Sequence, residues 1–151
     1  MSFGALLLAL HVLGAIVWVG GMFFALAILR PGMAFLDSNQ RLALHEQVFG
    51  RFFSVTWYIV PVMLVSGIAM EFLFYGGLTA TPAPMVVMTA TGLAMSAIFV
   101  AIVLGPWRDL RQSLKAENTS LAGSAAQRLR QLVSINLALG VLTTIIAVLD
   151  Y

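Results

Sequence analysis

The sequence contains no cysteine, and this absence excludes disulfide bonds, thiolate metal sites and iron–sulfur clusters. Charge is also scarce, because only 9% of the 151 residues are Asp, Glu, Lys or Arg and only two are histidine. Hydrophobic residues make up 61% of the chain, far more than a soluble domain with a polar surface contains. The composition therefore indicates a protein whose solvent is a lipid bilayer.

Four apolar runs are long enough to cross a membrane as helices. They cover residues 3–29, 52–74, 83–107 and 132–149. At about 1.5 Å per residue, each run reaches across a hydrocarbon core of roughly 30 Å, and the last run only just does so. Residues 39–51 are amphipathic and should form a surface segment before the second run, and the small polar residues 116–126 should form a hairpin. We predict a single all-α domain over residues 1–151, an integral membrane four-helix antiparallel bundle.

The basic residues indicate how the bundle is oriented. All eight lie either between the first and second runs or between the third and fourth: Arg30, Arg41, Arg51, Arg108, Arg111, Lys115, Arg128 and Arg130. The positive-inside rule places such loops in the cytoplasm, with both termini on the outer side of a bacterial inner membrane. The basic charge thus reports topology, so we expect the lipid bilayer as partner and no nucleic acid.

His11 is the only ionisable side chain in the first apolar run. A titratable group at bilayer depth is costly, so it is expected to face the bundle interior and to serve a ligand, a proton path or a hydrogen bond. Helical steps of three and four place Gly14, Trp18 and Gly21 on the same face as His11. Small residues on that face allow a second helix or a flat ligand to approach closely.

The second and third runs carry methionine and glycine at helical spacing. These residues are Met63, Gly67 and Met70 in the second run and Met85, Met88, Gly92 and Met95 in the third. Counting about 1.5 Å per residue puts Gly67 and Gly92 level with His11, which predicts a slot lined by thioethers beside an imidazole. Such a slot suits haem b, with His11 as axial ligand, Trp18 nearby and Met70 or Met88 opposite. A redox function would also require a partner such as a quinone.

Copper(I) is the alternative ligand of the same side chains, because it accepts both imidazole and thioether ligands. For copper the ligands would be His11, Met63, Met70, Met88 and Met95, converging on points along a path instead of enclosing a macrocycle.

Simpler explanations compete with both kinds of site. Methionine fills irregular gaps, and glycine at helical spacing often serves helix contact. His11 can be a neutral imidazole bonded to a backbone carbonyl or to a hydroxyl such as that of Thr143 or Thr144. His45 is expected at the membrane surface, and Glu71 as a solvated flank of the second run. Under these explanations the protein is a non-catalytic membrane subunit. Its small-residue faces would pack against other membrane helices, either of a partner protein or of a second copy of this chain in a homo-oligomer.

Residues 11–23 resemble the first span of small bacterial membrane proteins related to the copper-resistance D (CopD) family. Residues 51–54, with Pro61 and the pair Ser66-Gly67, are similar to that family's next span, and residues 128–140 are similar to its last. The resemblance implies a multi-pass membrane protein associated with copper uptake and resistance.

The arrangement of His11, Trp18 and Gly21 is also similar to that of the HemJ type of protoporphyrinogen oxidase, a four-helix membrane protein. This second resemblance implies haem binding, with His11 as the ligand. It does not extend to the oxidase activity, because the lysine of that family's third span is absent here and Asn136 is followed by leucine where that family has glutamate. Whether the protein is an oxidoreductase is therefore left open.

Overall fold

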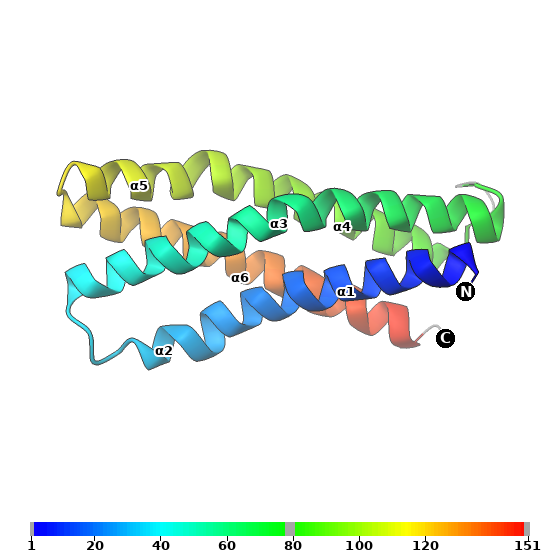
Figure 1. The fold of residues 1–151 in the computed structure, drawn as a ribbon, viewed down its shortest axis with the longest axis horizontal. Helices are drawn as coiled ribbons and strands as arrows, with labels where there is room; N and C mark the ends of the chain where they lie inside the picture. The colour runs from blue at the N-terminus through cyan, green and yellow to red at the C-terminus, as the bar shows by residue number, and fades with distance from the viewer. Residues whose placement is uncertain (1, 78–80, 150–151) are drawn as a thin grey trace.

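The computed structural model describes residues 2–77 and 81–149, which form four long helical spans lying side by side and alternating in direction (Figure 1). The spans consist of α1 (Phe3–Phe23), the π-helix η1 (Phe24–Leu29) and α2 (Arg30–Gly32); α3 (Ser38–Tyr75); α4 (Ala83–Ile102), the π-helix η2 (Val103–Trp107) and α5 (Arg108–Lys115); and α6 (Thr119–Leu149). Each span is long and apolar enough to cross a membrane. The prediction of an all-α four-helix membrane bundle is confirmed.

Local sequence signals set the two ends of α3. The side chain of Asp37 accepts a hydrogen bond from the backbone N–H of Gln40 at 2.9 Å, and the Gln40 side chain accepts one from the N–H of Asp37 at 3.3 Å. This reciprocal capping box satisfies two backbone donors that no helical carbonyl reaches. At the other end Gly76 adopts a φ of 77°, a left-handed conformation that glycine takes without strain. The helix therefore includes both the expected surface segment and the second apolar run.

The helix α6 starts earlier than expected. Residues 119–126 were predicted to belong to a hairpin, and this prediction is wrong because they form the first turns of α6. The side chain of Asn118 accepts a hydrogen bond from the N–H of Leu121 at 3.1 Å, which begins the helix. Ala122 and Ala125 are buried, since their small side chains let α6 pack closely on α5. Tertiary packing thus makes a polar, alanine-rich segment helical.

The helices behave differently at Pro61 and Pro106, which lie in the interior of the second and third spans. A proline is expected to kink a helix, yet α3 runs through Pro61 as one continuous helix. The break occurs in the third span, where Gly105, just before Pro106, leaves helical geometry with φ −103° and ψ −105°. Beyond this break α5 continues the span past the end of its apolar run.

Aromatic rings hold the inner part of the bundle together. Trp18 of α1 meets Phe99 of α4 edge to face, with ring centroids 6.3 Å apart. Phe53 of α3 contacts Phe99 at 6.0 Å and Trp107 at 5.3 Å. Such edge-to-face pairs stabilise the contact beyond their area burial. The first three spans are therefore joined through a shared aromatic core.

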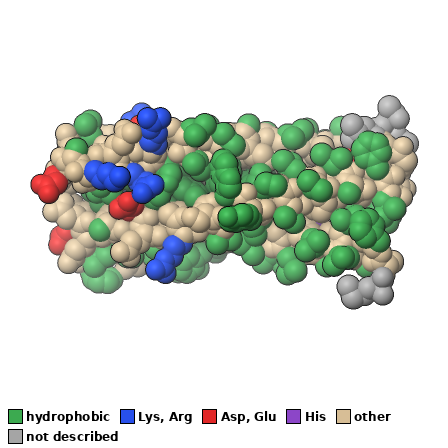
Figure 2. Space-filling view, turned by 45° about the horizontal axis from the view of Figure 1, so that its top comes forward, with side chains coloured by type: hydrophobic (Ala, Val, Ile, Leu, Met, Phe, Trp, Pro, Cys, Tyr) green, Lys and Arg blue, Asp and Glu red, His purple; other side chains and the backbone are tan. Residues whose placement is uncertain are grey.

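Charged side chains gather at one end of the bundle, on the left of the face shown in Figure 2. We call this the basic end, because all eight Lys and Arg residues belong to the helices and connections found there. The opposite end, where α1 begins and α6 ends, is called the far end. Apart from Glu71, the described part of the chain carries no Asp, Glu, Lys or Arg on the far-end side of Arg51 and Arg108.

Candidate functional site

His11 is hydrogen-bonded to α3 through one of its two ring nitrogens. Its Nδ1 atom lies 3.0 Å from the backbone carbonyl oxygen of Met63 and 3.1 Å from the hydroxyl oxygen of Ser66. A carbonyl can only accept a hydrogen bond, so the Nδ1 atom carries the proton and donates. The Ser66 hydroxyl itself donates to the same carbonyl at 3.1 Å. In this tautomer the Nε2 atom of His11 keeps a free lone pair, which is the form that binds a metal ion.

The hydrogen-bond partners of His11 are the chemical groups that the simpler explanation named, but they belong to other residues than the two threonines it suggested. A carbonyl and a hydroxyl were expected, and the hydroxyl comes from Ser66 on α3. Thr143, one of the suggested partners, donates instead to Thr91 of α4 at 2.8 Å. The other, Thr144, donates to the carbonyl of Gly140 within α6.

The glycines around His11 form a tightly packed seam between α1 and α3. A Cβ atom added to Gly67 would lie 3.2 Å from the Cε1 atom of His11, so the imidazole itself fills the space beside this glycine. A Cβ on Gly14 would lie 2.6 Å from the Cγ atom of Met63, and one on Gly21 would overlap the ring of Phe52. Glycine is thus used for close helix contact on this face. In α4, by contrast, a Cβ on Gly92 meets no atom within 4 Å.

Methionine is confined to the interior of the bundle. None of the methionines in the described ranges is exposed: Met22, Met33, Met63, Met70, Met85, Met88 and Met95 are all buried or half-buried. The exposed large apolar side chains are Phe, Leu, Ile, Val, Trp and Tyr. Polarizable thioethers therefore lie inside the bundle along much of its length.

Two of the buried methionines were not among our candidate ligands, and both lie on the basic-end side of His11. Met22 follows His11 by eleven residues in the same span, so the helical period could have pointed to it. Met33 lies just beyond α2, where no periodic pattern predicts which way a side chain faces.

The printed contacts place two thioethers, those of Met63 and Met95, along the inner face of α1. The Met63 side chain packs at Gly14, three residues from His11 and therefore about 4.5 Å further along α1. The methyl group of Met95 lies 3.0 Å from the position of a Cβ on Gly140 of α6, beside Val19. Met70 and Met88 are half-buried in the far-end halves of their spans.

A buried carboxylate lies in the far-end half of α3. Glu71 was expected as a solvated flank, and that expectation is wrong because only 5% of the residue is exposed. The hydroxyl of Thr89 on α4 donates to its Oε1 atom, while the buried Oε2 atom has no partner among residues 2–77 and 81–149. Glu71 and Thr89 directly follow Met70 and Met88 in the sequence. Polar and thioether groups are therefore neighbours on both helices.

Two further polar or aromatic candidates lie deeper in the core. Trp18 is almost fully buried against Phe99 and packs as part of the aromatic core. Asn136 of α6 is 1% exposed, and its Oδ1 atom accepts no hydrogen bond from the described residues.

His45 is buried near the start of α3, at the basic end, where its ring stacks on Phe49 with centroids 5.6 Å apart. The two histidines therefore lie in different halves of the bundle.

The described side chains restrict what kind of metal the protein can hold. No three His, Asp or Glu side chains come together within residues 2–77 and 81–149 in a way that could hold an ion. The described residues therefore do not form the set of three such side chains that zinc sites typically use. An ion bound near His11 would need ligands of another kind, and thioethers are among the side chains that the bundle offers.

Comparison with known proteins identifies the family. The family model described as "Copper resistance protein D" matches residues 46–149, more than half of the chain. No curated protein and no solved structure matched the sequence. His11 lies outside the matched range, so its role has to be argued from geometry alone. The three spans that follow α1 and its extension are nevertheless covered almost completely, and the chain belongs to the copper resistance protein D family.

Proposed function

We propose that this membrane protein binds copper(I) as cargo within its bundle and passes it along a path of thioether side chains that includes His11. The observation that carries the proposal is that none of the seven described methionines is exposed, while the exposed apolar surface uses other residues. Thioether sulfur and imidazole nitrogen are ligands that suit copper(I). Membership of the copper resistance protein D family supports the same ion.

The hydrogen bond of His11 supports its role as a ligand. Histidines that bind metal ions commonly donate their second ring N–H to a backbone carbonyl, which fixes the tautomer and the orientation of the ring. His11 has this arrangement, since its Nδ1 atom donates to Met63 and its Nε2 atom is left free. The ring is further held in place by close contact with Gly67. A rigid imidazole of this kind is prepared to receive a metal ion.

Met63 is the first thioether that we assign to the path. It supplies the carbonyl that orients His11, and its own side chain packs about one turn further along α1, at Gly14. Met95 and Met22 then continue the path toward the basic end, where Met33 is also buried. On the other side of His11, Met70 and Met88 lie next to Glu71 and Thr89, a polar pair suited to receive a cation.

Haem b is less well supported as the ligand. The slot that we predicted beside His11 includes Gly67, but the imidazole itself fills the space at Gly67 and Met63 fills the space at Gly14. The residues of this seam therefore do not fit a macrocycle. The open position at Gly92 is on α4 and does not widen the seam.

We further propose that the protein lies in the inner membrane of a bacterium with its basic end in the cytoplasm. The concentration of all Lys and Arg at that end supports this orientation under the positive-inside rule. In this orientation His11, with its free lone pair, lies in the half of the bundle that faces away from the cytoplasm.

Copper(I) binding by the detergent-purified protein tests the proposal. Titration with a copper(I)-specific chromophoric chelator, under reducing conditions, gives the affinity and the stoichiometry. We expect His11→Ala and Met63→Leu each to weaken binding by about tenfold or more, because each removes a ligand. His45→Ala is the matched control, since it removes the other buried histidine from the opposite half of the bundle. An absorption spectrum of the same samples reports any haem.

Two results would overturn the proposal. One is a wild-type protein that competes for copper(I) no better than the detergent alone. The other is a His11→Ala protein that is folded by circular dichroism and binds copper(I) as tightly as wild type. A Soret band that is lost in His11→Ala would show haem binding instead.

A further inference from the structure

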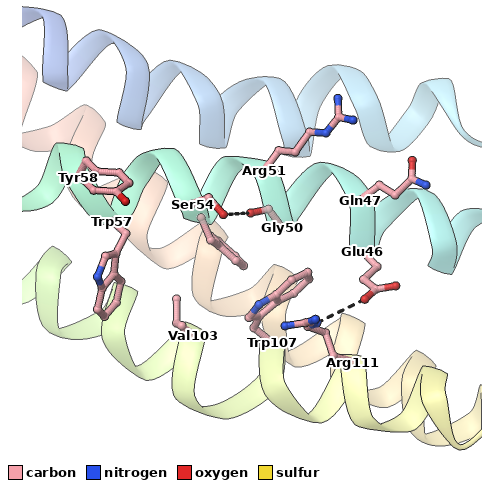
Figure 3. A pocket seen from close by; sticks show the side chains of 11 residues that line it. Glu46, Gln47, Gly50, Arg51, Ser54, Trp57, Tyr58, Val103, Trp107 and Arg111 are labelled. Atoms are coloured by element: carbon pink, nitrogen blue, oxygen red, sulfur yellow. Dashed lines mark hydrogen bonds and ion pairs between the residues drawn. The ribbon is translucent and has the colours of Figure 1, made fainter.

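A groove opens between α3 and the η2–α5 segment, in the half of the bundle that contains the basic end (Figure 3). Its volume is about 720 Å³. Aromatic residues line one part of it and charged residues the other: Phe53, Trp57, Tyr58 and Trp107 belong to the first group, and Glu46, Arg51 and Arg111 to the second. The groove does not include His11 or any methionine, so it is separate from the copper site.

The groove lies at the depth of the membrane interface and headgroups, with its far-end edge at the boundary of the hydrocarbon region. Tyr58 and Tyr75 are both exposed, and the 17 helical steps between them span about 26 Å, close to the hydrocarbon thickness of roughly 30 Å. Exposed aromatic residues such as Tyr58 and Trp57, which are 76% and 50% exposed, are typical of the membrane interface. Arg51 lies two turns further toward the basic end, at headgroup depth.

Only one of the two arginines in the groove has an acidic partner. The Nε atom of Arg111 lies 3.4 Å from the Oε1 atom of Glu46, and its guanidinium stands over the ring of Trp107 at 5.9 Å. Arg51 is exposed on the α3 wall, and no described carboxylate lies within ion-pair distance of it. A guanidinium in this position is suited to bind a phosphate with two parallel hydrogen bonds.

We propose that this groove binds an anionic phospholipid of the leaflet at the basic end. The lipid phosphate lies on Arg51, and an acyl chain lies along Trp57 and Val103 toward the bundle centre. Charge complementarity supports this occupant, because every Lys and Arg of the chain is at this end. A lipid also fits better than a soluble phosphate compound, since aromatic side chains line much of the groove and its far-end edge reaches the boundary of the hydrocarbon region at Tyr58.

The test uses the full-length protein in a neutral detergent, titrated with dioleoylphosphatidylglycerol, dioleoylphosphatidylcholine or inorganic phosphate. Native mass spectrometry counts the bound lipids, and the thermal midpoint reports stabilisation. We expect phosphatidylglycerol to bind and to raise the midpoint. The Arg51→Gln variant should bind it about tenfold more weakly, and Arg51→Lys should fall in between because lysine keeps the charge but loses the bidentate geometry.

Arg41→Gln is the matched control, because Arg41 is an exposed basic residue of the same helix that does not line the groove. It should bind phosphatidylglycerol within about twofold of wild type. Equal loss in Arg41→Gln and Arg51→Gln would overturn the proposal, since bulk surface charge would then explain binding. Equal binding of phosphatidylcholine, or equal stabilisation by inorganic phosphate, would also overturn it. Arg51 is exposed, so these variants are expected to fold.

Discussion

The imidazole of His11 lies against Gly67, with its Cε1 atom 3.2 Å from the position that a Cβ atom would occupy on that glycine. Gly67 therefore determines how closely the ring approaches α3. Because the ring also donates from Nδ1 to the carbonyl of Met63, both its position and its tautomer are set by α3. The side chain that we propose as a copper(I) ligand thus depends on the second span for its geometry.

This relationship predicts that Gly67→Ala weakens copper(I) binding while the ligands remain in place. The added methyl group displaces the imidazole by a few tenths of an ångström and strains its hydrogen bond to Met63. We expect the affinity to fall about three- to tenfold, as it does when a residue that orients a ligand is changed. Gly92→Ala is the control, because a Cβ there meets no atom within 4 Å. Equal affinities in the two variants would contradict the role of Gly67.

A second prediction concerns the neighbouring glycines Gly20 and Gly21. A side chain at Gly21 would overlap the ring of Phe52, whereas one at Gly20 meets nothing within 4 Å. Gly21→Val should therefore destabilise the bundle by about 1–3 kcal/mol through overpacking, and Gly20→Val should change its stability little. Thermal denaturation in detergent, followed by loss of helical circular dichroism, compares the two variants. A larger loss in Gly20→Val would contradict the α1–α3 packing.

The four spans could be predicted from the sequence because a run of about 20 apolar residues has few alternatives to a membrane helix. The residues at which the spans begin and end could not be predicted in this way. Residues 119–126 are polar and small, and they become helical because Ala122 and Ala125 pack against α5. Such tertiary contacts leave no periodic apolar signal in the sequence. The helix α5 differs in this respect, because Leu110 and Leu114 recur at helical spacing in a polar segment and indicate a helix that continues the third span beyond Gly105 and Pro106.

The candidate site could be predicted only in outline. His11 stands out because it is a histidine in an apolar run, and the counting of helical rise places Gly67 beside it, where the structure has it. Its partners could not be named, because Ser66 is one of several hydroxyls at similar depth and the rotation of α3 decides which one faces α1. The burial of Glu71 was not predicted either, because a carboxylate near the end of a span is expected in solvent unless the rotation of the helix is known.

The hydrogen bond between Thr91 and Thr143 gives a third prediction. Thr143 donates to Thr91 at 2.8 Å and also to the carbonyl of Leu139 in its own helix, so its hydroxyl hydrogen is shared. Interhelical hydrogen bonds in membrane proteins contribute about 0.6 kcal/mol on average. A double-mutant cycle with Thr91→Val, Thr143→Val and the double variant should therefore give a coupling of about that size in unfolding free energy. Strict additivity of the two single effects would argue against a direct bond.

The last prediction concerns Asn136, whose Oδ1 atom is buried and accepts no hydrogen bond from the described residues. An acceptor buried without a partner costs about 1–3 kcal/mol, so Asn136→Leu, whose side chain branches at the same carbon as asparagine, should leave the thermal midpoint unchanged or raise it. Asn136→Asp should lower it, because the same position would then bury a charge. Both midpoints are measured in the same detergent without copper. A clear loss of stability in Asn136→Leu would mean that the amide forms a hydrogen bond in the folded protein, and the search for its partner would begin with the neighbouring helices α1 and α4.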